Sequence, residues 1–128
     1  MLKALTTKCI GDRGERIAAK YLRRKGYKIV CRNFRSAHGE IDLVAASRDC
    51  LVFVEVKTRK DDEAHFERYG LPCEAVDKTK QRHILYTARI YLEKHPSDKA
   101  VRFDIVEVYL GDDARVTRIN HIENAFGQ

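Results

Sequence analysis

The segment Leu51–Lys57 constrains the fold more than any other part of the chain. It reads Leu-Val-Phe-Val-Glu-Val-Lys, and its first four residues are apolar on both faces of an extended strand. This pattern is typical of a strand in the middle of a sheet that is covered on both sides. An acidic residue directly after such a run is costly to bury unless a metal or a lysine neutralises it. We therefore expect a central strand with charged groups at its end.

Hydrophobic patterns predict two helices and four further strands around this strand. Apolar residues recur at helical spacing between residues 11 and 25, with Gly26 as a stop, and again from Asp77 to Pro96. Alternating or β-branched segments predict strands at 27–35, 40–46, 101–110 and 115–122. Residues 58–76 have no sustained period and are expected to form a loop. The chain is thus predicted to be an α/β protein with a mixed central sheet flanked by helices, in the order αβββαββ, and a single domain over residues 1–128.

Composition excludes several classes of protein. The chain has 128 residues, of which 44% are hydrophobic and 34% are charged, and this balance favours a globular domain over a disordered chain. No apolar run approaches the roughly 20 residues that cross a bilayer, so we expect no membrane association. The four cysteines lack the spacing of a zinc site, which favours free thiols and a cytoplasmic location. A P-loop, a GxGxxG turn and an ordered Ser-His-Asp set are also absent from the sequence.

Positive charge is concentrated in the first half of the chain. Residues 1–60 contain 15 Lys and Arg but 6 Asp and Glu, whereas residues 61–128 contain 10 and 13. Such a concentration suits a polyphosphate ligand such as nucleic acid, because each neutralised phosphate releases condensed counterions. A solvated helix face explains the same charge equally well. The candidate nucleic-acid-binding residues are Arg16, Lys20, Arg23, Arg32, Arg35 and Arg59.

Two carboxylates and a lysine can meet on neighbouring strands. The period of two places Glu40 and Asp42 on one face of their strand, and Glu55 and Lys57 on one face of the next. Asp42 and Glu55 could each give an oxygen to Mg²⁺, a hard cation that keeps several waters, and Lys57 would then lie beside the nucleophilic water. A plain salt bridge of Lys57 with Asp42 or Glu55 is the alternative. The other face of the first strand is predicted to hold Ile41, Leu43 and Ala45.

The two predicted helices can bring further polar groups to the same place. On a helical wheel Glu15 falls close to Leu22, so it lies at the edge of the stripe that packs on the sheet. Lys80 and Gln81 lie one turn before the inward stripe of the second helix, although surface or capping roles explain them as well.

Six segments of the chain carry a resemblance to a known family. Together they span most of the sequence, and they resemble the bacterial YraN family, whose members are similar to Holliday junction resolvases and other PD-(D/E)xK restriction-endonuclease-like proteins. The segments are residues 14–15 (GE), 32–35 (RNFR), 39–45 (GEIDLVA), 52–59 (VFVEVKTR), 102–104 (RFD) and 124–126 (NAF).

The resemblance implies a restriction-endonuclease-like fold and a set of site residues. Asp42 and Glu55 would be metal ligands for Mg²⁺ or Mn²⁺, Lys57 the catalytic lysine, Glu15 an additional acid and Glu40 a supporting residue. It also suggests a homodimer. The resulting hypothesis is a metal-dependent endonuclease that acts on DNA, including branched or structured DNA. The alternatives are a non-catalytic nucleic-acid-binding module on the same fold and a structural protein whose charges only keep it in solution.

Overall fold

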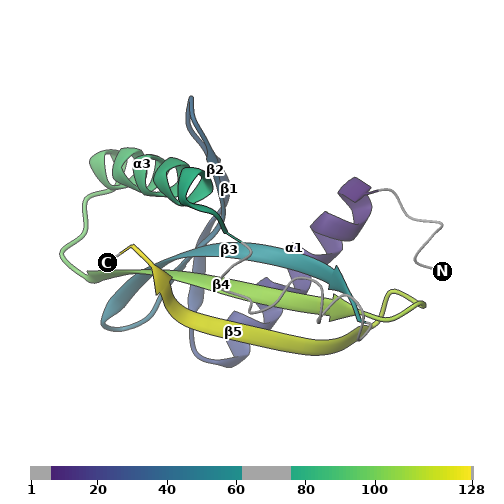
Figure 1. Ribbon diagram of the computed structural model, residues 1–128. Coiled ribbons are helices and arrows are strands. Elements are labelled where there is room, and N and C mark those ends of the chain that lie inside the picture. Colours follow the sequence, from purple (N-terminus) through teal and green to yellow (C-terminus); the bar gives the residue numbers. More distant parts are fainter. Residues whose placement is uncertain (1–6, 62–75, 128) are drawn as a thin grey trace.

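Five strands form one sheet in the order β1-β2-β3-β4-β5 (Figure 1). The computed structural model describes residues 7–61 and 76–127. Strands β3 and β4 are parallel and the other neighbouring pairs are antiparallel, so the predicted mixed sheet in an α/β protein is confirmed. A parallel pair needs a long crossover connection, and α3 lies in it. The described elements are α1 (Thr7–Arg24), β1 (Lys28–Arg35), β2 (Glu40–Ala46), β3 (Cys50–Lys60), α3 (Lys78–Lys94), β4 (Ala100–Leu110) and β5 (Val116–Phe126).

Strand β3 has a hydrophobic cluster on each of its faces. Val52 and Val54 pack in the cluster that contains Leu22 of α1, whereas Phe53 packs in the cluster that contains Tyr91 of α3. All three β3 side chains are at most 1% exposed. The two helices therefore cover opposite faces of the sheet, and the prediction of a doubly covered central strand is confirmed.

Several predicted boundaries were wrong because pairing in the sheet extends the strands. The predicted loop starts at residue 58, but β3 continues to Lys60, where it pairs with Leu110 of β4. Strand β5 likewise continues to residue 126 instead of 122. A neighbouring strand supplies hydrogen bonds to charged residues as well as to apolar ones, so local composition does not mark these ends. The rest of the predicted loop, residues 62–75, lies outside the described residues.

The β1–β2 hairpin bends at Asn33, and this overturns the prediction for Ile41. Ile41 packs in the α3-side cluster, whereas Leu43 and Ala45 pack in the α1-side cluster. The change of face lies between the pairs Arg32–Leu43 and Phe34–Ile41, where Asn33 has a φ of 52°. A left-handed residue breaks the regular alternation of a strand, so the two ends of the hairpin face different sides.

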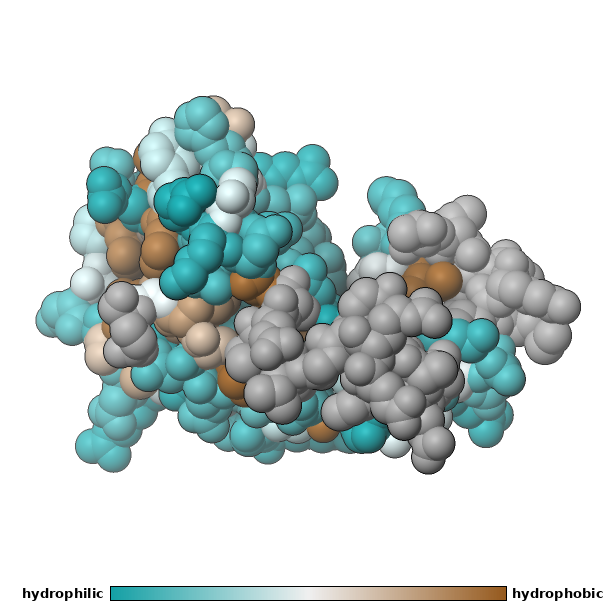
Figure 2. Space-filling view, in the orientation of Figure 1, coloured by the Kyte–Doolittle hydropathy of each residue, from teal (hydrophilic) through white to brown (hydrophobic). Residues whose placement is uncertain are grey.

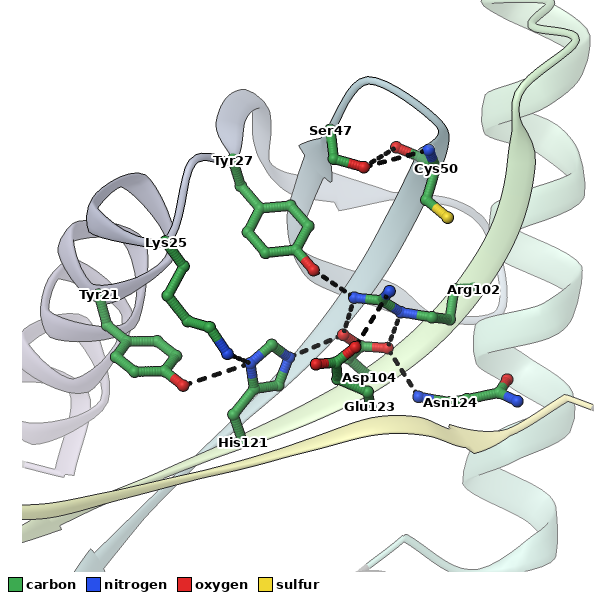
Figure 3. A network of polar contacts seen from close by, with 10 residues as sticks. All are labelled: Tyr21, Lys25, Tyr27, Ser47, Cys50, Arg102, Asp104, His121, Glu123 and Asn124. Carbon is green, nitrogen blue, oxygen red and sulfur yellow. Dashed lines mark hydrogen bonds and ion pairs between the residues drawn. The ribbon is translucent and has the colours of Figure 1, made fainter.

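Hydrogen bonds to a buried carboxylate link β5 to β4 (Figure 3). Asp104 of β4 is fully buried and accepts hydrogen bonds from Arg102, from the Asn124 backbone amide and from His121 Nε2 at 2.7 Å. Burial alone would raise the pKa of Asp104, but the bonds from His121 and Arg102 hold it below its ordinary value. The segments 102–104 and 124–126, which carried part of the resemblance, thus have a structural role.

Among the residues coloured in Figure 2, charged and polar side chains predominate, and apolar side chains emerge between them over α3. No helix among the described residues is long and apolar enough to cross a membrane.

Candidate active site

Strands β2 and β3 separate at the position of Asp42. They pair from Leu43 to Ala46 of β2, opposite Val54 to Leu51 of β3, and the first residues of β2 lie beyond this paired region. The Val56 backbone amide of β3 instead donates a hydrogen bond to Asp42 Oδ2 at 2.8 Å. This bond fixes the Asp42 carboxylate in the fork between the two strands.

Helix α1 approaches the same fork through a glycine. A Cβ atom on Gly14 would collide with the Thr58 hydroxyl of β3, so only glycine allows the helix to pack this close to the strand. The next residue is Glu15, and the close approach brings its carboxylate to the fork from the α1 side of the sheet.

The four principal residues predicted from the sequence line one pocket. Glu15 of α1, Asp42 of β2, and Glu55 and Lys57 of β3 surround a cavity of about 270 Å³. Glu55 shares its face of β3 with Phe53, which packs toward α3. Carboxylates from both sides of the sheet can therefore meet because β2 leaves β3 at this point. The structure thus brings residues 42, 55 and 57 together around one pocket.

Two lysines lie close to the Glu55 carboxylate. Lys57 Nζ is 3.3 Å and Lys80 Nζ of α3 is 3.6 Å from Glu55 Oε2, and the Glu55 side chain is 6% exposed. The salt bridge that the sequence left as an alternative is thus present. Gln81, the other polar residue considered on this helix, donates to the Val76 carbonyl instead.

Burial and crowding of like charges disfavour the ionised carboxylates. Burial and the nearby Glu55 raise the pKa of Asp42 to about 8, although its bond from the Val56 amide opposes the shift. Burial and the nearby Glu40 raise the pKa of Glu15 as well. Acids with strongly shifted pKa values in a cleft are candidates for functional residues. Here the crowded carboxylates would be stabilised either by binding protons or by binding a cation.

Asn33 connects two of these acids and was not predicted as a site residue. In the amide orientation that satisfies both neighbours, its side-chain nitrogen lies 3.0 Å from Glu15 Oε1 and 3.0 Å from Glu40 Oε1. Asn33 is also the residue with positive φ in β1. Its place in the segment 32–35 was a signal, but only the bend of the hairpin shows that the amide reaches the acids.

The donor set fits a hard divalent cation that keeps most of its waters. Among the described residues, no group of three or more His, Cys, Asp or Glu side chains is placed to hold a metal ion, so a bound cation would take most of its ligands from water. Asp42 and Glu55 supply carboxylate oxygens on the two sides of the fork, and Mg²⁺ is commonly held by one or two carboxylates together with waters and substrate phosphates. A bound cation would also relieve the repulsion that raises the Asp42 pKa.

The chain matches the model of "Uncharacterised protein family UPF0102" over residues 14–108. It belongs to the UPF0102 family. A UPF0102 protein of Caldanaerobacter subterraneus is 45% identical over 127 residues, which cover 98% of this chain and 100% of the relative. One from Symbiobacterium thermophilum is 47% identical over 118 residues, or 91% and 95% of the two chains. The resemblance to the YraN family is confirmed, since the two names denote the same family.

The region shared with the UPF0102 family contains the whole candidate site. Glu15, Asp42, Glu55, Lys57 and Lys80 all lie between residues 14 and 108. Gly14, whose absent side chain lets α1 reach β3, is the first matched residue.

The basic residues predicted to bind nucleic acid occupy different surroundings. Arg16 and Arg32 line a second cavity of about 190 Å³ that shares Glu15 with the pocket of Asp42, Glu55 and Lys57. Arg35 forms an exposed ion pair with Glu40, and Lys20 and Arg23 are exposed on α1. Arg59 lies elsewhere: its side chain is 14% exposed and its Nε is 2.7 Å from the buried Glu107 carboxylate. The structure thus brings Arg16 and Arg32 to the site but not Arg59.

The stability of the metal-free protein is expected to fall as the pH rises from 6 to 8. The raised pKa of Asp42 means that the folded state holds a proton that the unfolded state has released, so this stabilisation is lost as the pH approaches 8. We expect Tm in EDTA to drop by on the order of 5 °C over this range. Asp42→Asn removes the titrating group and should flatten the curve, whereas identical curves for the two proteins would contradict the prediction.

Proposed function

We propose that the chain is a metal-dependent endonuclease that hydrolyses phosphodiester bonds of DNA. The observation that supports this most strongly is the convergence of Glu15, Asp42, Glu55 and Lys57 around one pocket that is open to solvent. Two acids and a lysine on adjoining strands of a mixed sheet match the D…(D/E)xK pattern of restriction-endonuclease-like nucleases. The specific nuclease fold is part of the same proposal.

The residues of the pocket have distinct roles in hydrolysis. Asp42 and Glu55 would hold a divalent cation, which would supply positive charge for the phosphate oxygens and help to activate water. Lys57 Nζ lies 3.3 Å from Glu55 and donates hydrogen bonds that orient the attacking water or a phosphate oxygen. The water oxygen forms a bond to phosphorus while the bond from phosphorus to the leaving sugar oxygen breaks, and a proton from the water ends on that leaving oxygen. Glu15 and Glu40 would add negative charge near such a cation.

Arg16 and Arg32 are placed to hold the DNA backbone beside this pocket, because they line the adjoining cavity. The Arg16→Ala/Arg32→Ala protein should bind duplex DNA more weakly and reduce the slope of log K against log salt by about 2. Arg48→Ala is the matched control, since Arg48 is exposed in the turn at the far end of β2. Titrations by fluorescence anisotropy at several salt concentrations in EDTA measure both effects. An unchanged slope in the double variant would place the DNA on another surface.

A panel of DNA structures tests the endonuclease proposal directly. Supercoiled plasmid, linear duplex, single-stranded DNA and a four-way junction are incubated with Mg²⁺, Mn²⁺ or EDTA, each beside the Asp42→Ala protein. We expect cleavage products with either metal, none in EDTA, and none with the variant. Products that also form with Asp42→Ala would show that the activity belongs to another site or to a contaminant.

The second candidate function is a nucleic-acid-binding module that does not cut. The positions of Lys57 and Lys80 beside Glu55 favour it, because two ammonium groups can balance this acid without a metal. Such a protein would bind DNA, yield no product with Mg²⁺ or Mn²⁺, and show no rise of Tm when either metal is added.

A further inference from the structure

A separate groove lies beside the active-site pocket, between the turn that joins β1 to β2 and helix α3. Its volume is about 500 Å³. Lys80 lines it, and the Lys80 ammonium is also 3.6 Å from Glu55 of the active-site pocket. The groove therefore adjoins the carboxylates. The other side chains considered below that line it are Arg35, His38, Glu40 and His83.

The groove is held in shape by contacts between its two walls. The Ser36 and Thr87 hydroxyl oxygens are 2.7 Å apart, and Thr87 in turn donates to the His83 carbonyl at 2.8 Å. A Cβ atom on Gly39 would lie 3.2 Å from His83 and 3.1 Å from Thr87, so the turn packs directly on the helix. A preformed groove loses little conformational entropy when it binds a ligand.

One exposed aromatic ring, His38, lines the groove, and it contacts a second exposed ring, Tyr86, just outside the lining. The His38 and Tyr86 rings contact each other edge to face with their centroids 4.9 Å apart, and Tyr86 is 40% exposed. Neither ring belongs to the buried clusters. Exposed aromatic rings beside basic groups are the usual platform on which unpaired bases stack.

The charge and the size of the groove suit a nucleotide strand. The groove is lined by two side chains that are positively charged at neutral pH, Arg35 and Lys80, and by one acidic side chain, Glu40. The Arg35–Glu40 ion pair is 3.5 Å long, with the Arg35 side chain 75% exposed, and such a pair is weak enough for a phosphate to compete with it. Pockets of about 300–1,000 Å³ hold ligands the size of a nucleotide.

We propose that this groove binds an unpaired nucleotide strand next to the scissile phosphodiester, with phosphates on Arg35 and Lys80 and a base stacked on His38 and Tyr86. This inference rests on the proposed function and names its substrate class. The preferred DNA would carry a single-stranded segment that adjoins the cut, as in an overhang, a flap or an opened junction.

Binding measured in EDTA tests the groove without any cleavage. A blunt duplex and the same duplex with a single-stranded tail are titrated by fluorescence anisotropy, and a 2-aminopurine in the tail reports base stacking. Wild-type protein should bind the tailed duplex about 10-fold more tightly, as expected for one stacked base, and should quench the 2-aminopurine. His38→Ala/Tyr86→Ala should lose both effects, whereas Leu85→Ala, an exposed residue that neither lines the groove nor belongs to the His38–Tyr86 ring pair, should keep them.

Each result supports or contradicts the proposal that the groove binds an unpaired strand. Equal affinity for the two duplexes, or a preference that survives in His38→Ala/Tyr86→Ala, would overturn the proposal. Melting curves of both variants ensure that folded proteins are compared. Cleavage of the same two duplexes in Mg²⁺ is measured separately. If neither duplex is cut, the endonuclease proposal fails. The groove proposal still holds in that case, provided that wild-type protein prefers the tailed duplex and His38→Ala/Tyr86→Ala does not.

Discussion

Replacing Lys57 by alanine is expected to slow metal-dependent DNA cleavage by about 10²- to 10³-fold, the range lost when one hydrogen-bond donor that stabilises the transition state is removed. Lys57 lines the carboxylate pocket, and its ammonium is 3.3 Å from Glu55 with the side chain 30% exposed. It can thus contact both the acid and a substrate phosphate. Initial rates under single-turnover conditions with Mg²⁺ measure the effect, because they report the chemical step rather than product release.

The matched control for Lys57→Ala is Lys60→Ala. Lys60 is an exposed lysine of the same strand, so its loss changes the net charge equally but removes nothing from the pocket. We expect cleavage by Lys60→Ala within about twofold of the wild-type rate, since surface substitutions of this kind have small effects. Binding in EDTA should change little in either variant. If Lys57→Ala cuts as fast as Lys60→Ala, Lys57 has no role in the chemistry.

Replacing Asp104 by asparagine is expected to destabilise the fold by about 1.5–3 kcal/mol, the contribution of hydrogen bonds to a charged group. Asp104 is fully buried, and its carboxylate accepts two hydrogen bonds from Arg102 and one from His121. Asparagine has nearly the same shape but no charge, so the Arg102 guanidinium would lose its buried counter-charge. Urea unfolding followed by circular dichroism gives the change in the free energy of unfolding.

Glu123→Gln is the control for this second prediction because Glu123 also pairs with Arg102. Its carboxylate is 3.2 Å from Arg102 Nη1, but the Glu123 side chain is 51% exposed. Exposed ion pairs contribute about 0–1 kcal/mol, so this variant should unfold close to the wild-type midpoint. If both variants lost the same free energy of unfolding, the burial of Asp104 would not determine how much its hydrogen bonds stabilise the protein.

Much of the candidate site could be predicted because its residues lie next to strong local signals. Glu55 and Lys57 directly follow a run that is apolar on both faces, and such a run identifies a central strand without further information. Asp42 and Glu15 were assigned from strand alternation and from a helical wheel. The face predicted for Asp42's neighbour Ile41 was nevertheless wrong, because the positive φ of Asn33 reverses the alternation in a way that a regular period cannot reveal.

The sequence by itself determined the central strand, the two helices that cover it and the types of residue available for chemistry, since these follow from local periodicity and composition. Only the tertiary structure decided that the acids meet. Strand β2 separates from β3 at Asp42, and Gly14 lets α1 pack against Thr58, so carboxylates from both faces of the sheet reach one pocket. The physical reason is that strand pairing and helix packing join residues far apart in the chain, and their geometry depends on the whole sheet rather than on any one segment.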